Sequence, residues 1–318
     1  MLRNRRVGTG AVVLACAVVI SLGTASAQLR RLPSAPNCPI FPANNPWNER
    51  VDAQPVAANS ARIIASIGVG TGLHPDFGSG LYDGEPIGIP FDVVSHLTPR
   101  SRVAFDYADE SDRGPYPIPK AVHIEGGSAS TGDRHAILVD KNACKLYELF
   151  ALYPTANGGW KAGSGAIWNL ASNALRPAGW TSADAAGLPI FPGLARYDEV
   201  ASGAINHALR FTVAHTRAAY VYPARHEASS SNDPSFPPMG LRVRLKANVD
   251  LSGFPRQARI VLQALKTYGM IVADNGSNWY ISGAPDPRWS NDDLHTLGRI
   301  TGADFEVVDT RSLPHPGA

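Results

Sequence analysis

The central part of the chain, from Trp168 to His207, carries residue types that bind and cleave sugars. Aromatic rings stack on sugar rings, amide and guanidinium groups bond hydroxyls, and two carboxylates can act as acid and as base or nucleophile. The candidates for chemistry are Asp184, Asp198, Glu199 and His207, with His207 as a general base, and the candidates for binding are Trp168, Asn173, Trp180 and Arg196. This combination predicts an open, acid-lined trough.

The same residues have a structural interpretation. Ser182 and Asp184 are typical of the start of a helix, and Asp198-Glu199 suits a solvated first helical turn. A tryptophan in an interior loop belongs to the core more often than to a sugar platform. Both interpretations stay open at this point.

Known catalytic signatures are missing from the sequence. It has no G-x-S-x-G elbow, no H-E-x-x-H, no phosphate-binding glycine loop and no dinucleotide fingerprint. Their absence argues against α/β-hydrolases, zincins, NTPases and nicotinamide enzymes. A convergent serine site is still possible, because triads are defined by geometry rather than by order along the chain.

Two other groups of residues could bind metal ions. The first is acidic and could offer oxygens to Ca²⁺, but its spacing matches no calcium loop, so we expect a solvated acidic turn. Its members are Asp106, Asp109, Glu110, Asp112, His123, Glu125, Arg134, His135 and Asp140. The second, formed by His207, His215 and His226, gives at most a pair of ligands, so we predict no metal site there. We therefore expect no cofactor, with Ca²⁺ as the alternative.

The first 27 residues are typical of a signal peptide. Arginines precede an apolar run from Ala11 to Ile20, and Ala25 and Ala27 form an A-x-A cleavage site. A lipoprotein box ending at Cys16 would leave an apolar mature start, so we favour cleavage after Ala27. The predicted product is secreted, extracellular or periplasmic, and has no membrane segment.

Net charge excludes a nucleic-acid partner. The chain carries 29 basic and 27 acidic residues, and loss of the three leader arginines leaves a net charge of −1. A near-neutral protein lacks the basic surface that nucleic acid or an anionic membrane requires.

Two cysteines remain after cleavage. Cys38 and Cys144 form an even pair in an oxidising compartment, which predicts one disulfide. The bridge would pin an N-terminal arm to a core hairpin.

The chain contains 30 glycines and 26 prolines, and both residue types interrupt helices and strands. We therefore expect many short elements. We expect a signal peptide (1–27), an extended arm (28–59) and a single β-rich domain (60–318). The predicted class is mainly β (α+β), a β-sandwich or distorted barrel with long loops and three or four short helices. Hairpins are predicted over 136–150, 207–222 and 270–282, the best helix over 257–268, and mostly irregular structure over 160–193.

Four runs of sequence resemble those of a group of exported bacterial proteins without established activity. They span 45–48, 134–140, 179–189 and 274–280, for example Asn45-Pro46-Trp47-Asn48 and Asp274-Asn275-Gly276-Ser277-Asn278-Trp279-Tyr280. The resemblance implies export and a bacterial source, and it assigns no catalytic residue.

Our leading hypothesis is a secreted carbohydrate-active enzyme that cleaves a polysaccharide by hydrolysis or elimination. One alternative is a non-catalytic protein that binds a polysaccharide, a cell-surface glycan or another surface. Another is a cell-wall or peptide-processing enzyme that uses Ser or His.

Overall fold

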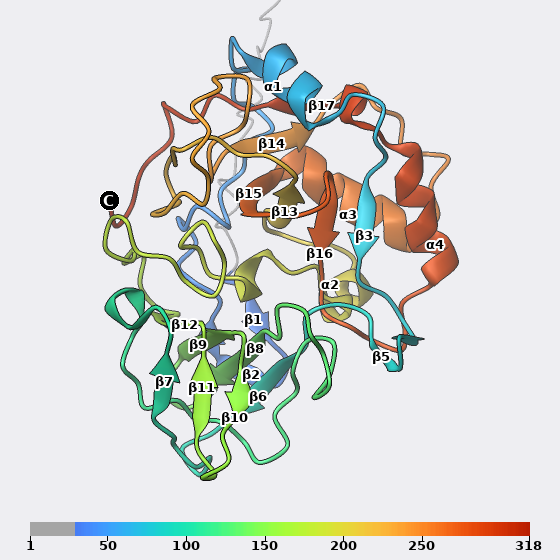
Figure 1. The fold of residues 1–318 in the computed structure, drawn as a ribbon. Coiled ribbons are helices and arrows are strands. Elements are labelled where there is room, and N and C mark those ends of the chain that lie inside the picture. The colour runs from blue at the N-terminus through green and yellow to red at the C-terminus, as the bar shows by residue number, and fades with distance from the viewer. Residues whose placement is uncertain (1–28) are drawn as a thin grey trace, which may run out of the picture.

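A four-stranded sheet forms the core of one half of the molecule (Figure 1). The computed structural model describes residues 29–318, so the predicted signal peptide lies outside the described residues. The strands of this sheet, in spatial order, are β12 (Ser164–Asn169), β9 (Lys145–Phe150), β8 (Ala136–Asp140) and β6 (Phe91–Val94). Strands β8 and β9 form the predicted antiparallel hairpin, while β6 runs parallel to β8.

Strand β8 is buried along its whole length because both faces of its sheet are covered. Its side chains alternate between two hydrophobic clusters, as the period of two of a strand requires. Ile137 and Val139 join the large cluster that runs through the molecule, and Ala136 and Leu138 join a smaller outer cluster. A three-stranded sheet contributes to that outer cluster and consists of β10 (Tyr153–Pro154), β11 (Trp160–Ala162) and β7 (Val103–Phe105).

A six-stranded mixed sheet forms the other half. Its spatial order is β17 (Phe305–Val307), β14 (Arg242–Leu245), β15 (Met270–Asn275), β13 (Leu209–Val213), β16 (Tyr280–Ser282) and β3 (His74–Asp76). The helix α3 (Arg256–Thr267) packs against β14 through an apolar stripe that includes Val261 and Leu265. Gly269, with a φ of 66°, follows that helix at the position where a left-handed residue ends helices.

The remaining elements are short. They are the helices α1 (Ser60–Ile67), α2 (Tyr197–Ser202) and α4 (Asn291–His295), the strand pairs β1 (Arg31–Leu32) with β2 (Ala35–Pro39) and β4 (Leu81–Tyr82) with β5 (Glu85–Pro86), and the 3-10 helices η1 (Ala108–Glu110), η2 (Phe191–Gly193), η3 (Thr296–Arg299) and η4 (Gly302–Asp304). No helix of the described chain combines the length and apolarity that crossing a membrane requires.

The N-terminal segment 29–59 is attached to the body at several points, of which Trp47 and a disulfide are two. Trp47 is buried in the large hydrophobic cluster, and its carbonyl accepts the N–H of Ala208. The predicted disulfide between Cys38 and Cys144 is present and ties β2 to the turn between β8 and β9. The segment and residues 60–318 therefore share one core, while the boundary predicted at residue 59 stays a prediction.

The structure confirms the mainly-β, α+β class with four short α-helices, and it corrects three details. Across residues 29–318 the sheets do not close into a barrel. Strand β13 pairs with β15 and β16 rather than with residues 218–222, and it separates β15 from β16, so the hairpins predicted at these two places are wrong. Strands β11 and β12 lie in the segment 160–193 that we expected to be mostly irregular.

Candidate functional site

Three of the residues predicted from the sequence form a buried ion cluster at α2. Glu199 forms ion pairs with Arg196 at 2.6 Å and with Arg30 at 3.2 Å, and its carboxylate lies 3.0 Å from Nε2 of His207. The second ring nitrogen of His207 lies 2.7 Å from the carbonyl of Ala208. The cluster thus joins α2 to the N-terminal segment and to the start of β13.

The protonation states of this cluster suit a structural ion pair. Burial opposes ionisation of Glu199, but the guanidinium groups of Arg196 and Arg30 hold its pKa far below the usual range. Burial, assisted by the positive charge of Arg30, lowers the pKa of His207 to about 4. His207 is fully buried, so it has no access to a substrate as a general base.

Of the other two predicted carboxylates, Asp184 lies apart from this cluster in its contacts, whereas Asp198 shares Arg196 with it. Asp184 is fully buried and forms a two-point ion pair with Arg210, at 2.7 and 2.9 Å. Asp198 is partly exposed and pairs with Arg196 at 3.3 Å. The structure therefore does not join Asp184, Asp198 and Glu199 into one acid-lined trough.

The predicted sugar-binding residues are engaged with one another or with the core. Trp168 is buried, and the guanidinium group of Arg176 lies 5.6 Å from its ring and 5.5 Å from the half-buried ring of Trp180. Asn173 bonds the side chains of Asn44 and Asn45. These contacts hold the segment 168–180 against the N-terminal segment, so we assign no substrate contact to it.

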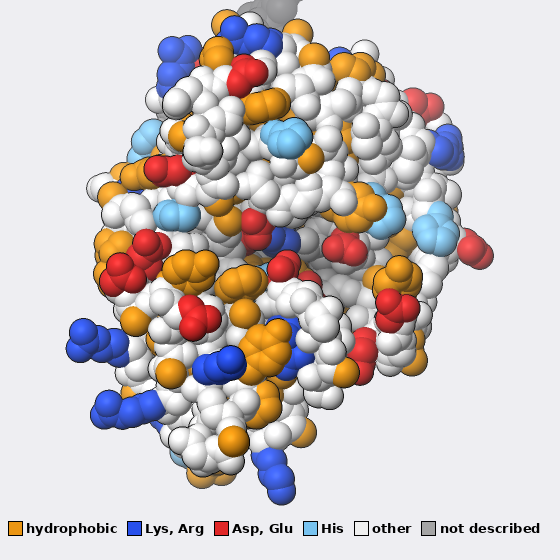
Figure 2. Space-filling model, viewed as in Figure 1, with side chains coloured by type: hydrophobic (Ala, Val, Ile, Leu, Met, Phe, Trp, Pro, Cys, Tyr) orange, Lys and Arg blue, Asp and Glu red, His pale blue; other side chains and the backbone are white. Residues whose placement is uncertain are grey.

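A cleft lies between the two halves of the molecule, and Figure 2 shows acidic side chains around a hollow there. Its first cavity has a volume of about 610 Å³. Strand β3, the β4–β5 hairpin, the loop that carries Glu125, and α4 all contribute to its lining. This cavity contains groups that the sequence prediction did not select.

Three carboxylates line this cavity, those of Asp76, Glu85 and Glu125. Asp76 and Glu125 reach it from opposite halves of the molecule. Asp76 ends β3 of the six-stranded sheet, and Glu125 lies in the loop before β8 of the four-stranded sheet. The surrounding protein, and then the nearby Glu125 carboxylate, raise the pKa of Asp76. Burial opposes ionisation of Glu125 as well, but its contact with His135 lowers its pKa overall. The pKa values of the two carboxyl groups therefore shift in opposite directions.

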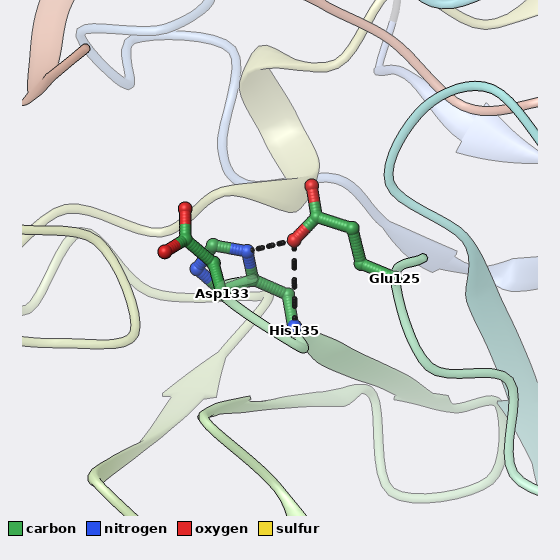
Figure 3. A group of neighbouring side chains, drawn as sticks. All are labelled: Glu125, Asp133 and His135. Carbon is green, nitrogen blue, oxygen red and sulfur yellow. Dashed lines mark hydrogen bonds and ion pairs between the residues drawn. The ribbon is translucent and has the colours of Figure 1, made fainter. Parts of the chain in front are cut away.

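His135 fixes Glu125 in place (Figure 3). Its Nδ1 lies 2.5 Å from Oε2 of Glu125, and its Nε2 lies 3.0 Å from the carbonyl of Ala183. A carbonyl can only accept, so Nε2 carries a proton, and a proton on Nδ1 completes an imidazolium–carboxylate pair. Burial opposes this charge, but Glu125 raises the pKa of His135 to about 9.

An aromatic surface borders the same cavity. The ring of His74 stacks on that of Tyr280, with centroids 4.0 Å apart and planes at 25°. Both residues line the cavity, as does Tyr82, which is 75% exposed on the β4–β5 hairpin. Flat, accessible rings of this kind can carry the apolar face of a sugar.

A second cavity, of about 340 Å³, lies on the other side of His135. Asp133, Asp184 and Asp274 line it, together with Glu110 and His226. Burial and then the neighbouring Asp184 raise the pKa of Asp274 to about 7. Because His135 contacts Glu125 of the first cavity and Ala183 of the second, the two cavities adjoin at its ring.

One group at this junction could hold a metal ion. Donor atoms of Glu125, Asp133 and His135 lie within 4.8 Å of one another. Ca²⁺ takes oxygen ligands, which the two carboxylates could supply. Both ring nitrogens of His135 are already engaged, so its imidazole would not be a ligand. The arrangement is compatible with Ca²⁺ bound through the carboxylates.

The sequence contained partial signals for these residues. Glu125 and His135 were in the acidic group that we expected to be a solvated turn, but His135 is buried directly before strand β8. Asp274 and Asp76 were not selected, because Asp274 directly precedes an Asn-Gly turn motif and Asp76 lies in a glycine-rich stretch. Only pairing between distant strands brings them together.

The chain matches no family model, no curated protein and no solved structure. The function is therefore inferred from the geometry of the cleft.

Proposed function

We propose that the protein hydrolyses glycosidic bonds of a polysaccharide in the cleft between its two halves. The observation that supports this function is the pair Asp76 and Glu125, which line one cavity and whose pKa values shift in opposite directions. Glycoside hydrolysis needs two such carboxyl groups, one as an acid and one as a base or nucleophile.

The roles follow from the directions of the two pKa shifts. Asp76 keeps its proton more readily and donates it to the glycosidic oxygen as the bond to the anomeric carbon breaks. Glu125, ionised beside His135, takes the proton of the attacking water or bonds the anomeric carbon before water replaces it. His135 is a positioning residue that keeps Glu125 ionised and oriented.

Substrate binding is assigned to the stacked pair of His74 and Tyr280. An accessible ring pair beside the carboxylates could align a sugar with its glycosidic bond near them.

The charge of the cleft favours hydrolysis over elimination. Elimination from a uronate needs cations that neutralise the sugar carboxylate. Among the described residues, neither cavity is lined by Lys or Arg, and Arg210 near them is paired with Asp184. An acidic polysaccharide would be repelled, so we propose a neutral or basic one.

We infer export from the signal-peptide pattern, and the disulfide Cys38–Cys144 fits an oxidising compartment. The proposed partner is an extracellular or periplasmic polysaccharide. A bound Ca²⁺ would contact Glu125 and Asp133 and would order the loop that carries them.

A second candidate is a glycan-binding protein without catalysis. The exposed rings of His74 and Tyr82 and the half-buried ring of Tyr280 favour it, because sugar binding by rings needs no carboxyl group with a shifted pKa.

A screen of neutral, amino and acidic polysaccharides separates these functions. The mature protein should release new reducing ends from a neutral or amino polysaccharide and no unsaturated product from uronates. Binding without new reducing ends would favour the second candidate. Cleavage with unsaturated products would overturn the assignment to hydrolysis.

A further inference from the structure

The second cavity holds four carboxyl groups with little compensating charge. They belong to Glu110, Asp133, Asp184 and Asp274. Among the described residues, only Asp184 of these four forms an ion pair, which is with Arg210. Glu110 accepts the backbone N–H of Thr181 at 2.9 Å. Asp133 and Asp274 have no cationic partner among the described ion pairs, and both line the hollow.

Asp274 shows most directly that the cavity lacks a cation to pair with its carboxylates. It lies near the end of β15, and its carboxyl group accepts the N–H of the next residue, Asn275, at 2.7 Å. The charged groups that act on it are Asp184, Arg210 and His135. Arg210 and His135 are committed to Asp184 and Glu125, so the mostly buried Asp274 is left without a cation of its own.

We propose that this cavity binds the protonated amine of an amino sugar, so that the substrate is a polysaccharide with free amino groups. This inference rests on the proposed function, because it places one sugar of the chain in each of the two adjoining cavities. An ammonium group between Asp133 and Asp274 would supply the missing charge and form charge-assisted hydrogen bonds. The cavity volume of about 340 Å³ lies in the range of small-ligand sites.

Neutral sugars fit this cavity less well. A hydroxyl group offers no charge to carboxylates that are partly withdrawn from water, whereas an amine lowers the cost of ionising Asp274. An N-acetylated sugar has lost that charge and should be discriminated against. Below about pH 7, protonation of Asp274 should weaken the preference.

Isothermal titration calorimetry on the mature protein tests the inference at pH 7.5 and low salt. The probes are a glucosamine tetramer, its fully N-acetylated counterpart and spermidine, which carries amines without sugar. We expect the glucosamine tetramer to bind at least 10-fold more tightly than either of the others. Equal affinity for the acetylated tetramer would overturn the inference, and so would equal affinity for spermidine, because it would remove the role of the sugar.

Two variants locate the binding. Asp274→Asn and the exposed Asp133→Asn should each remove most of the preference, while Asp52→Asn on the surface should keep it. Asp133→Asn leaves the core untouched, so it stays informative if Asp274→Asn fails to fold. A preference retained in folded Asp133→Asn and Asp274→Asn proteins would overturn the inference.

The outcome also separates the inference from the proposed function. Selective binding of the amine without cleavage would support the proposed amine site and contradict the proposed hydrolase activity. Cleavage of N-acetylated and free-amine polymers at equal rates, without selective binding, would retain the hydrolase and reject the amine site.

Discussion

The carboxylate of Glu125 lies 2.5 Å from Nδ1 of His135, and Nε2 of the same ring lies 3.0 Å from the carbonyl of Ala183. The three groups connect the walls of both cavities. His135 is buried at the N-terminal end of β8, so its position is set by the best-covered strand of the molecule.

Replacement of His135 by Gln should reduce the loss of folding stability that occurs as the pH rises into the alkaline range. The folded state raises the pKa of His135 from 6.5 to about 9. Its protonation therefore stabilises the folded protein fully below pH 6.5, and this contribution is lost as pH rises through 9. Thermal unfolding from pH 6 to 10 should show a decline in Tm for the wild type that is smaller in the variant. Parallel curves would contradict the assigned charge.

Replacement of His207 should instead change how folding stability depends on acidic pH. Its pKa falls from 6.5 to about 4 in the folded protein, so its contribution is present above pH 6.5 and is lost as pH falls through 4. In His207→Gln, Tm should fall less steeply between pH 6.5 and 4. Activity per folded molecule should stay near that of the wild type; a loss of 100-fold would restore His207 as a catalytic candidate.

Removal of the disulfide should destabilise the protein strongly. The bridge joins residues 106 apart in sequence, and the chain-entropy model assigns about 4–5 kcal/mol to a loop of this size. The double variant Cys38→Ser/Cys144→Ser should unfold at a much lower denaturant concentration. An unchanged midpoint would show that the N-terminal segment is held by Trp47 and Arg30 without the bridge.

Tyr280→Ala should weaken substrate binding more than it slows the chemical step. Loss of a stacking platform corresponds to about a 10-fold increase in KM, with a smaller change in kcat. The half-buried Tyr220 lies outside both cavity linings, so Tyr220→Ala is the matched control. An unchanged KM for Tyr280→Ala would remove the platform from the binding site.

The sequence predicted local structure better than it predicted the site. Turn residues and alternation were sufficient for the β8–β9 hairpin, and an apolar stripe with a following glycine was sufficient for α3. The Asn275-Gly276 turn misled the prediction, because β13 inserts between the strands on either side of it. Local turn signals do not specify which distant strand completes a sheet.

The site residues were harder to find for the same reason. Glu199 and Asp184 stand out in the sequence among tryptophans and polar residues, yet each is paired with a buried arginine. Asp76 and Glu125 lie 49 positions apart in unremarkable loops, and they face one cavity only because β3 and β8 belong to the two sheets that border the cleft.

The most direct test of the proposed function compares turnover by four variants on the polysaccharide that the wild type cleaves. Asp76→Asn and Glu125→Gln should each lower kcat by about 10²–10⁴-fold with the fold retained. The matched variants Asp198→Asn and Glu199→Gln should keep kcat per folded molecule within a few-fold of the wild type, although Glu199→Gln should be less stable. Full turnover by Asp76→Asn and Glu125→Gln would contradict the account.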